Sequence, residues 1–196
     1  MTLKRGRISL VVLLAMATAA CQTEDKAPQP RFVSSIDATG AKLARKSQQS
    51  EHGYFIEFRS RYALSYGHSY VIFGRTNKAG AMINPEVAGL APATLDTAPY
   101  VMGHFLPVPA ETGASDGDLE EEYRSASWRV LLTEDEYQEV VANIRKLKAK
   151  SRFWHASLYN CNAFVAEIAR SMGYKTPGIW LRPQEFITKL RQMNGG

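Results

Sequence analysis

The stretch Trp154-His-Ala-Ser-Leu-Tyr-Asn-Cys-Asn-Ala-Phe-Val165 contains a cysteine at the point where a helix is predicted to begin. Asn160 is a favourable N-cap residue, and apolar residues recur at helical spacing from Cys161 to Met172. The pattern therefore predicts a helix that begins at Cys161. In the first turn of a helix, a sulfur atom lies beside unpaired N–H groups and the positive end of the helix dipole. Both stabilise a thiolate relative to a thiol.

Cys161 also has a second interpretation, because it lies on the apolar stripe of the predicted helix. Free cysteine is among the most buried residue types, and a buried structural cysteine is chemically inert. The stretch by itself leaves both roles open, a catalytic thiol and a core residue.

The N-terminus is typical of a bacterial export signal, predicted over residues 1–20. A basic segment at 1–7 precedes an apolar run at 8–17 that is too short to span a bilayer comfortably. Small residues then precede Cys21, in an arrangement that resembles a lipoprotein lipobox with Cys21 as the lipidated residue. Thr18 stands where such boxes usually carry leucine, so signal cleavage after Ala20 without lipid is the alternative.

Lipidation of Cys21 implies a protein of the bacterial cell envelope, held in the membrane by its N-terminal lipid. Gln22 follows the cysteine where an aspartate would retain the protein at the inner membrane, so the outer membrane facing the periplasm is expected. Cys161 would then be the single free thiol in an oxidising compartment. A disulfide between Cys21 and Cys161 is the alternative if no lipid is added.

Composition divides the rest of the chain into a flexible tether at 21–50 and one folded domain at 51–196. The tether is rich in Lys, Pro, Gln, Ser and Ala. The formal charge of +5 falls to about +2 once the three basic residues of the signal are removed. So small an excess, with no aromatic-and-basic stripe, argues against nucleic acid as a partner.

Within the domain, strands are predicted before most of the helices. Strands are expected at 54–59, 69–74, 81–84, 101–108 and 127–132, with a hairpin loop at 75–80. Helices are expected after the capping box at 133–136, at 161–172 and at 183–192. Residues 89–100 and 111–122 are expected to be irregular. This order predicts an α+β domain with an antiparallel sheet packed against helices.

A thiol nucleophile requires a base within hydrogen-bond reach. His68 is the first candidate, because it follows Gly67 at the start of the strongest predicted strand and can point towards a helix start across the sheet edge. A polar histidine that only caps the strand is the alternative for this residue. His155 is the second candidate, whereas His52 and His104 are expected to be structural.

A Gly-His strand start, a hairpin, further strands and then Tyr-Asn-Cys-Asn-x-Phe-Val at a helix start resemble a known family. They are similar to the circularly permuted NlpC-like branch of the papain-like fold. This branch includes the lecithin:retinol acyltransferase-like proteins and groups of bacterial lipoproteins. The resemblance covers residues 52–172, and the histidine precedes the cysteine, as it does in that branch.

The resemblance implies that Cys161 is the nucleophile and His68 the general base. The backbone N–H of Cys161 would contribute to an oxyanion hole. A third polar residue from the next strand would orient the imidazole. The matching segment, 81–87, contains no histidine, so Glu86 is the first candidate and Asn84 the second, although Pro85 lies between them.

Three residues near these positions are candidate substrate contacts: Tyr66, Trp154 and Asn160. For Tyr66, packing against the sheet edge is the alternative. No cofactor or metal is expected, because the acidic residues of 116–122 lack the spacing of a calcium loop and no histidine–cysteine spacing indicates zinc.

These observations lead to the expectation of a membrane-anchored cysteine hydrolase or acyltransferase that acts on an amide or ester bond. A peptidoglycan stem peptide is the first expected substrate and a lipid acyl group the second. The alternative is a non-catalytic envelope lipoprotein that uses the same fold as a binding or scaffold module. A secreted toxin-like effector is a third possibility, which requires that Cys21 carries no lipid.

Overall fold

The computed structural model describes residues 53–63 and 66–196. The predicted signal peptide, Cys21, the tether at 21–50 and His52 lie outside the described residues. Within the described ranges, no helix has both the length and the apolar character needed to cross a membrane.

The main sheet has four strands in the order β3-β2-β1-β6, and all neighbouring pairs are antiparallel. Its strands are β1 (Tyr54–Arg61), β2 (His68–Thr76), β3 (Met82–Gly89) and β6 (Arg124–Leu132). Aromatic and β-branched residues in β1 and β2 favour strands, as the sequence predicted. A second sheet, in the order β4-β5-β7, joins β4 (Ala91–Pro92), β5 (Val108–Glu111) and β7 (Phe153–Trp154).

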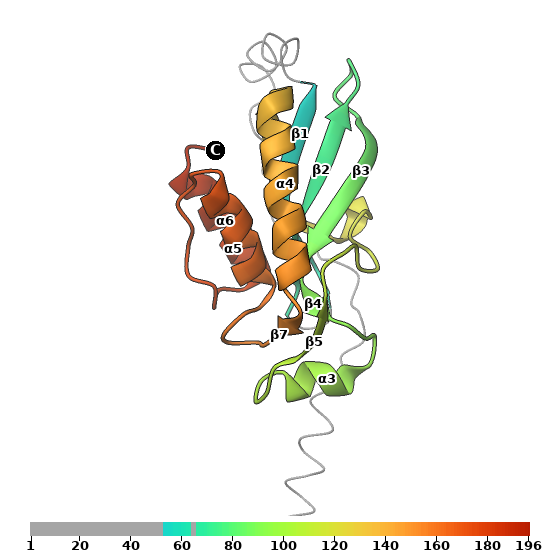
Figure 1. The fold of residues 1–196 in the computed structure, drawn as a ribbon, viewed down its shortest axis with the longest axis vertical. Helices are drawn as coiled ribbons and strands as arrows, with labels where there is room; N and C mark the ends of the chain where they lie inside the picture. Colours follow the sequence, from blue (N-terminus) through green and yellow to red (C-terminus); the bar gives the residue numbers. More distant parts are fainter. Residues whose placement is uncertain (1–52, 64–65) are drawn as a thin grey trace, which may run out of the picture.

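Three helices lie on one side of the main sheet (Figure 1): α4 (Glu134–Lys150), α5 (Cys161–Ser171) and α6 (Pro183–Met193). Their apolar residues and those of the sheet form the core, which includes Ile56, Phe58, Val71, Phe73, Ile144, Phe164, Phe186 and Leu190. A short helix, α3 (Thr97–Met102), lies at the far end beside the second sheet (Figure 1). The predicted α+β class with an antiparallel sheet packed against helices is confirmed.

The opposite face of the sheet carries buried charges. Glu57 and Arg59 are almost fully buried and form an ion pair with each other. The Nε of Arg129 lies 2.5 Å from Glu57 Oε2, and Nη1 of Arg59 lies 2.7 Å from Glu121 Oε1. Burial alone would lower the pKa of Arg59, but Glu57 and Glu121 hold it above its ordinary value. Each buried charge thus has an opposite charge beside it, which offsets the cost of its desolvation.

The prediction of a strand at 101–108 is wrong. Residues up to Met102 belong to α3, turns follow, and only Val108 begins β5. Pro99 lies in the first turn of α3, where its missing N–H breaks no helical hydrogen bond. The irregular segment predicted at 89–100 therefore also contains the start of this helix, together with β4.

The strand predicted at 81–84 continues through Pro85 to Gly89. It is an edge strand, where a proline without an N–H is tolerated. Its pairing with β2 shifts register between Phe73 and Arg75, and Asn84 has a positive φ of 43°. This irregularity decides which residue of β3 lies beside the start of β2.

Candidate active site

Cys161 is the first residue of α5, as the sequence predicts, and Asn160 caps the helix. The Oδ1 of Asn160 accepts a hydrogen bond from the backbone N–H of Ala163 at 3.0 Å. Its Nδ2 donates to the carbonyl oxygens of Ala156 at 2.8 Å and Ile179 at 3.2 Å. Both polar atoms of this buried side chain are therefore bound within the protein. The expected role of Asn160 as a substrate contact is replaced by a structural one.

Asn162 holds the other side of the cysteine and is fully buried. Its Oδ1 accepts from the Ser69 hydroxyl at 2.8 Å, and its Nδ2 donates to the carbonyls of Ile179 at 3.0 Å and Leu181 at 2.7 Å. The side chain thus joins β2, the start of α5 and the connection between α5 and α6. This arrangement fixes Cys161 relative to the first residues of β2.

The structure places His68 close enough to Cys161 for the imidazole to lower the pKa of the thiol, although the two residues are far apart in the sequence. Cys161 is 5% exposed and His68 is 8% exposed. Burial raises the pKa of the Cys161 thiol, whereas His68 and the hydroxyl and N–H of Ser69 lower it. The net result is a pKa below the ordinary value of a thiol, which favours the reactive thiolate.

Ser69 is a site residue that sequence reasoning missed. It is fully buried on β2 and contacts both Cys161 and Asn162. Its position next to His68 is a weak signal in the sequence. Neighbouring residues of a strand point to opposite faces and do not usually share a site, so Ser69 was not expected there. Here the helix start lies across the end of the strand, so both residues reach the sulfur.

Neither Asn84 nor Glu86 lies beside His68, and their prediction as the orienting residue is wrong. Glu86 pairs in register with Phe73, which is about 16 Å along β2 from His68 at the usual strand rise. The Glu86 carboxylate is instead 3.7 Å from the Arg145 guanidinium on α4. Asn84 is exposed at the irregular point of β3.

The residue of β3 that lies against the imidazole is Gly89. A Cβ atom at this position would lie 2.8 Å from His68 Nε2, so no side chain fits there without moving the ring. Tyr70 packs beside the imidazole on the same face of β2, with ring centroids 5.6 Å apart and planes inclined by 12°. The site therefore has an aromatic neighbour and a glycine where a polar orienting side chain was expected.

Two tyrosines border the cysteine. Tyr66 is 47% exposed and its hydroxyl donates to the Leu181 carbonyl at 3.3 Å. Burial and the nearby Cys161 raise the pKa of the Tyr66 phenol. Tyr100 on α3 is half-buried, and its pKa is raised by burial, by Glu111 and, to a smaller extent, by Cys161. Tyr100 was missed because its segment was expected to be irregular.

The remaining candidates lie apart from the sulfur or within the core. Trp154 is 9% exposed and packs against Gly103 and the ring of Tyr100, so it supports the site from inside and is not an open substrate contact. The Nδ1 of His155 accepts from the Ser157 N–H at 3.2 Å. His104 does not lie in a strand as expected, and its Nδ1 is 3.0 Å from the Tyr100 carbonyl oxygen.

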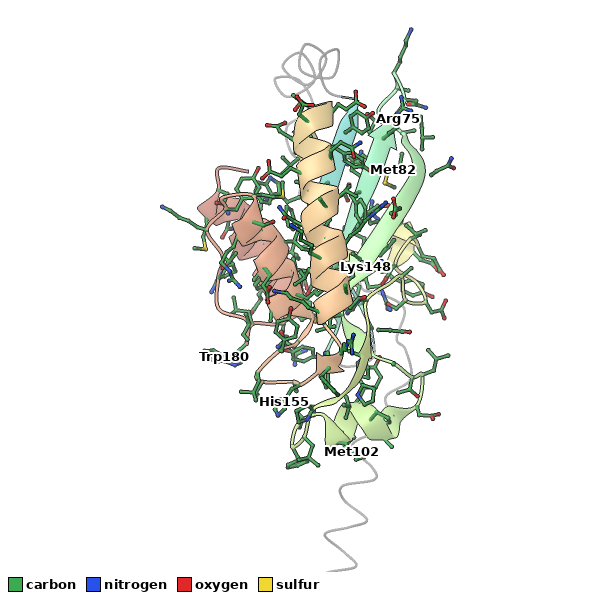
Figure 2. All side chains as sticks on the ribbon, viewed as in Figure 1. Arg75, Met82, Met102, Lys148, His155 and Trp180 are labelled. Atoms are coloured by element: carbon green, nitrogen blue, oxygen red, sulfur yellow. The ribbon has the colours of Figure 1, made fainter. Side chains whose placement is uncertain are left out.

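Several exposed apolar side chains lie on α3 and the turns after it, on β7, and on the connections before and after α5; Figure 2 labels two of them, Met102 and Trp180. We call this the apolar end surface; it consists of Val101, Met102, Phe105, Leu106, Phe153, Leu158 and Trp180. Two hydrogen bonds connect its segments, from Ala156 N to Gly103 O at 2.9 Å and from Trp180 Nε1 to Ser157 O at 2.9 Å. The segment with Leu158 leads directly to Cys161.

Within the described part of the chain, no three His, Cys, Asp or Glu side chains are grouped so that they could hold a metal ion. Comparison of the chain with protein-family models, with curated protein sequences and with solved structures found no match.

Proposed function

We propose that the protein is a cysteine hydrolase or acyltransferase in which Cys161 attacks the carbonyl carbon of an ester or amide. The observation that carries the proposal is the contact between the Cys161 thiol, at the start of α5, and the His68 imidazole. A thiol with a lowered pKa beside a base is the arrangement that nucleophilic catalysis requires. A buried structural cysteine has no need of either feature.

The reaction follows from these two groups. His68 takes the thiol proton as the Cys161 sulfur forms a bond to the carbonyl carbon, and the same proton then passes to the leaving alcohol or amine as its bond to that carbon breaks. Water, deprotonated by His68, hydrolyses the thioester and restores the thiol; in a transferase an acceptor alcohol or amine replaces the water. The Cys161 backbone N–H, which has no intrahelical partner at the first helical position, stabilises the oxyanion.

The order of the elements supports the proposed membership of the permuted NlpC-like branch. The histidine begins β2, antiparallel strands follow, and the cysteine begins a helix late in the chain. This is the order that the resemblance implies. We also propose that Cys21 carries a lipid which holds the enzyme at the envelope membrane.

The apolar end surface favours a substrate with an acyl chain over a polar stem peptide. The sequence alone ranked the peptidoglycan stem peptide first. However, large apolar side chains such as Leu158 and Trp180 are exposed on the connections that lead to and from α5. Burying such groups against a hydrocarbon chain yields roughly 25 cal/mol per Å² of apolar area removed from water.

One observation favours the alternative of a non-catalytic binding module. Gly89 provides no polar side chain to orient His68. If the imidazole cannot act as a base, the same fold serves to bind an envelope partner.

The pH dependence of Cys161 alkylation tests the proposal. We expect the full-length protein, purified in detergent, to react with iodoacetamide at a rate that rises with pH. The inflection of this profile should lie at a pH below the ordinary thiol pKa of about 8.5. His68→Ala should move the inflection to higher pH, because it removes the group that stabilises the thiolate. Peptide mass spectrometry assigns the label to Cys161.

His104→Ala is the matched control, since His104 is an exposed histidine outside the thiol pair. It should leave the profile unchanged. A thiol that reacts only after unfolding, or a profile that His68→Ala does not move, would favour the binding module.

The substrate class is tested with a series of p-nitrophenyl esters of increasing acyl length. We expect kcat/KM to rise from acetate to octanoate, because the longer chain contacts the apolar end surface. Replacement of Leu158 by serine should reduce the gain for octanoate and leave acetate hydrolysis unchanged. Leu119→Ser is the control, as it alters an exposed leucine outside that surface. Equal rates along the series would contradict the acyl preference.

A further inference from the structure

We infer that Tyr70 is a positioning residue for His68, in the role that a polar side chain of the next strand has in related thiol enzymes. The inference rests on the proposed function, because orientation of the imidazole is important only if His68 acts as a base. Tyr70 would hold the ring at a site where the expected third residue is missing.

The geometry restricts the imidazole from two directions. Tyr70 lies two residues after His68 on the same face of β2, and the rings are nearly parallel, with planes inclined by 12°. Gly89 pairs with Tyr70 in register, and its backbone lies against the Nε2–Cε1 edge of the imidazole. The ring is therefore held between an aromatic plane and a backbone that has no side chain.

Tyr70 is itself anchored. Its ring is fully buried, and its hydroxyl donates to the Asp118 carbonyl at 2.7 Å. The Asp118 carboxylate is in turn held by Arg61 Nε and by the Ser115 N–H, each at 2.7 Å. Burial and Asp118 raise the pKa of the Tyr70 phenol, so the hydroxyl stays protonated and continues to donate. The loop around Asp118 thus fixes the plane on which the imidazole rests.

A stacked ring and a carboxylate have different effects on the base. Stacking limits the tilt of the imidazole and keeps it directed towards the sulfur, but it adds no negative charge. Charged and titratable groups near the imidazole include the Cys161 thiol on α5 and the Tyr70 phenol on β2. Arg59 and Arg61 on β1 lie opposite Tyr70 and His68, and Arg61 pairs with Asp118. Loss of the stack should therefore destabilise the thiolate, because the imidazole is no longer held beside the sulfur.

The test compares variants of Tyr70 and Gly89 in the full-length protein, with the alkylation profile of Cys161 as the readout. Tyr70→Leu removes the aromatic plane, and we expect the inflection to move towards that of His68→Ala, with several-fold slower alkylation at neutral pH. Tyr70→Phe keeps the plane and loses only the hydroxyl, so it should retain most of the original profile. A purely structural role would lower thermal stability in Tyr70→Leu and leave the inflection in place.

Gly89→Ala is a second, independent variant, because its new Cβ would contact His68 Nε2 directly. It should move the inflection in the same direction. Gly113→Ala is the matched control, since no atom lies within 4 Å of a Cβ at that position. Gly89→Ala decides the question if Tyr70→Leu does not fold.

The outcomes separate this inference from the proposed function. If His68→Ala moves the profile but folded Tyr70→Leu and Gly89→Ala do not, Tyr70 has no positioning role and the thiol–imidazole pair stands. If His68→Ala itself has no effect, the proposed function fails first, and the inference fails with it.

Discussion

Replacing His68 by alanine is expected to slow the turnover of p-nitrophenyl octanoate by about 10²–10⁴-fold, the usual contribution of a positioned general base. His68 is the basic side chain that acts on the Cys161 thiol, and it can accept the thiol proton. Without it, the thiol is less often ionised, and the water that hydrolyses the thioester is not deprotonated. The loss should appear in kcat more than in KM, because the imidazole acts on the reacting bonds.

Steady-state kinetics of purified full-length variants measure this effect. Cys161→Ser defines the background rate, since a serine hydroxyl is a far weaker nucleophile beside the same base. His104→Ala should retain full activity, as its ring packs near Trp154 and not beside Cys161. Unchanged turnover in His68→Ala would show that hydrolysis does not use this pair.

Replacing Asn162 by alanine is expected to lower the free energy of unfolding by about 3 kcal/mol, because a buried polar group left without a partner costs about 1–3 kcal/mol. The change removes one hydrogen bond that Ser69 donates to Asn162 and two that Asn162 donates to the carbonyls of Ile179 and Leu181. Those carbonyls are only partly buried, so water can satisfy part of the loss. The start of α5 would then be less firmly held against β2.

Urea unfolding followed by circular dichroism measures this change. Asn143→Ala is the control, because it replaces a half-buried asparagine on α4 in a position where alanine favours the helix. We also expect Asn162→Ala to slow alkylation of Cys161 at neutral pH, since Ser69 loses its fixed position. Stability equal to that of the control would show that Asn162 does not tie these segments together.

Elements with local signals could be predicted from the amino-acid sequence. Asn160 and the apolar repeat after Cys161 defined the start of α5, and the Thr133–Glu136 capping box, present with both hydrogen bonds, defined the start of α4. Such signals depend on residues within one helical turn, so they can be read without knowledge of the fold. The alternation of side chains along β1 and β2 is equally local.

Contacts between side chains that are distant in the sequence depend on how the elements pack. Ser69 and Asn162 are 93 residues apart, and their contact depends on how α5 packs across the end of β2. The orienting residue was misplaced because the pairing of β3 with β2 places Gly89 opposite Tyr70, beside the imidazole, and Glu86 opposite Phe73, on the way to Arg145. Register is set by strand pairing and core packing over the whole sheet, and a shift of a few residues changes every neighbour of the site.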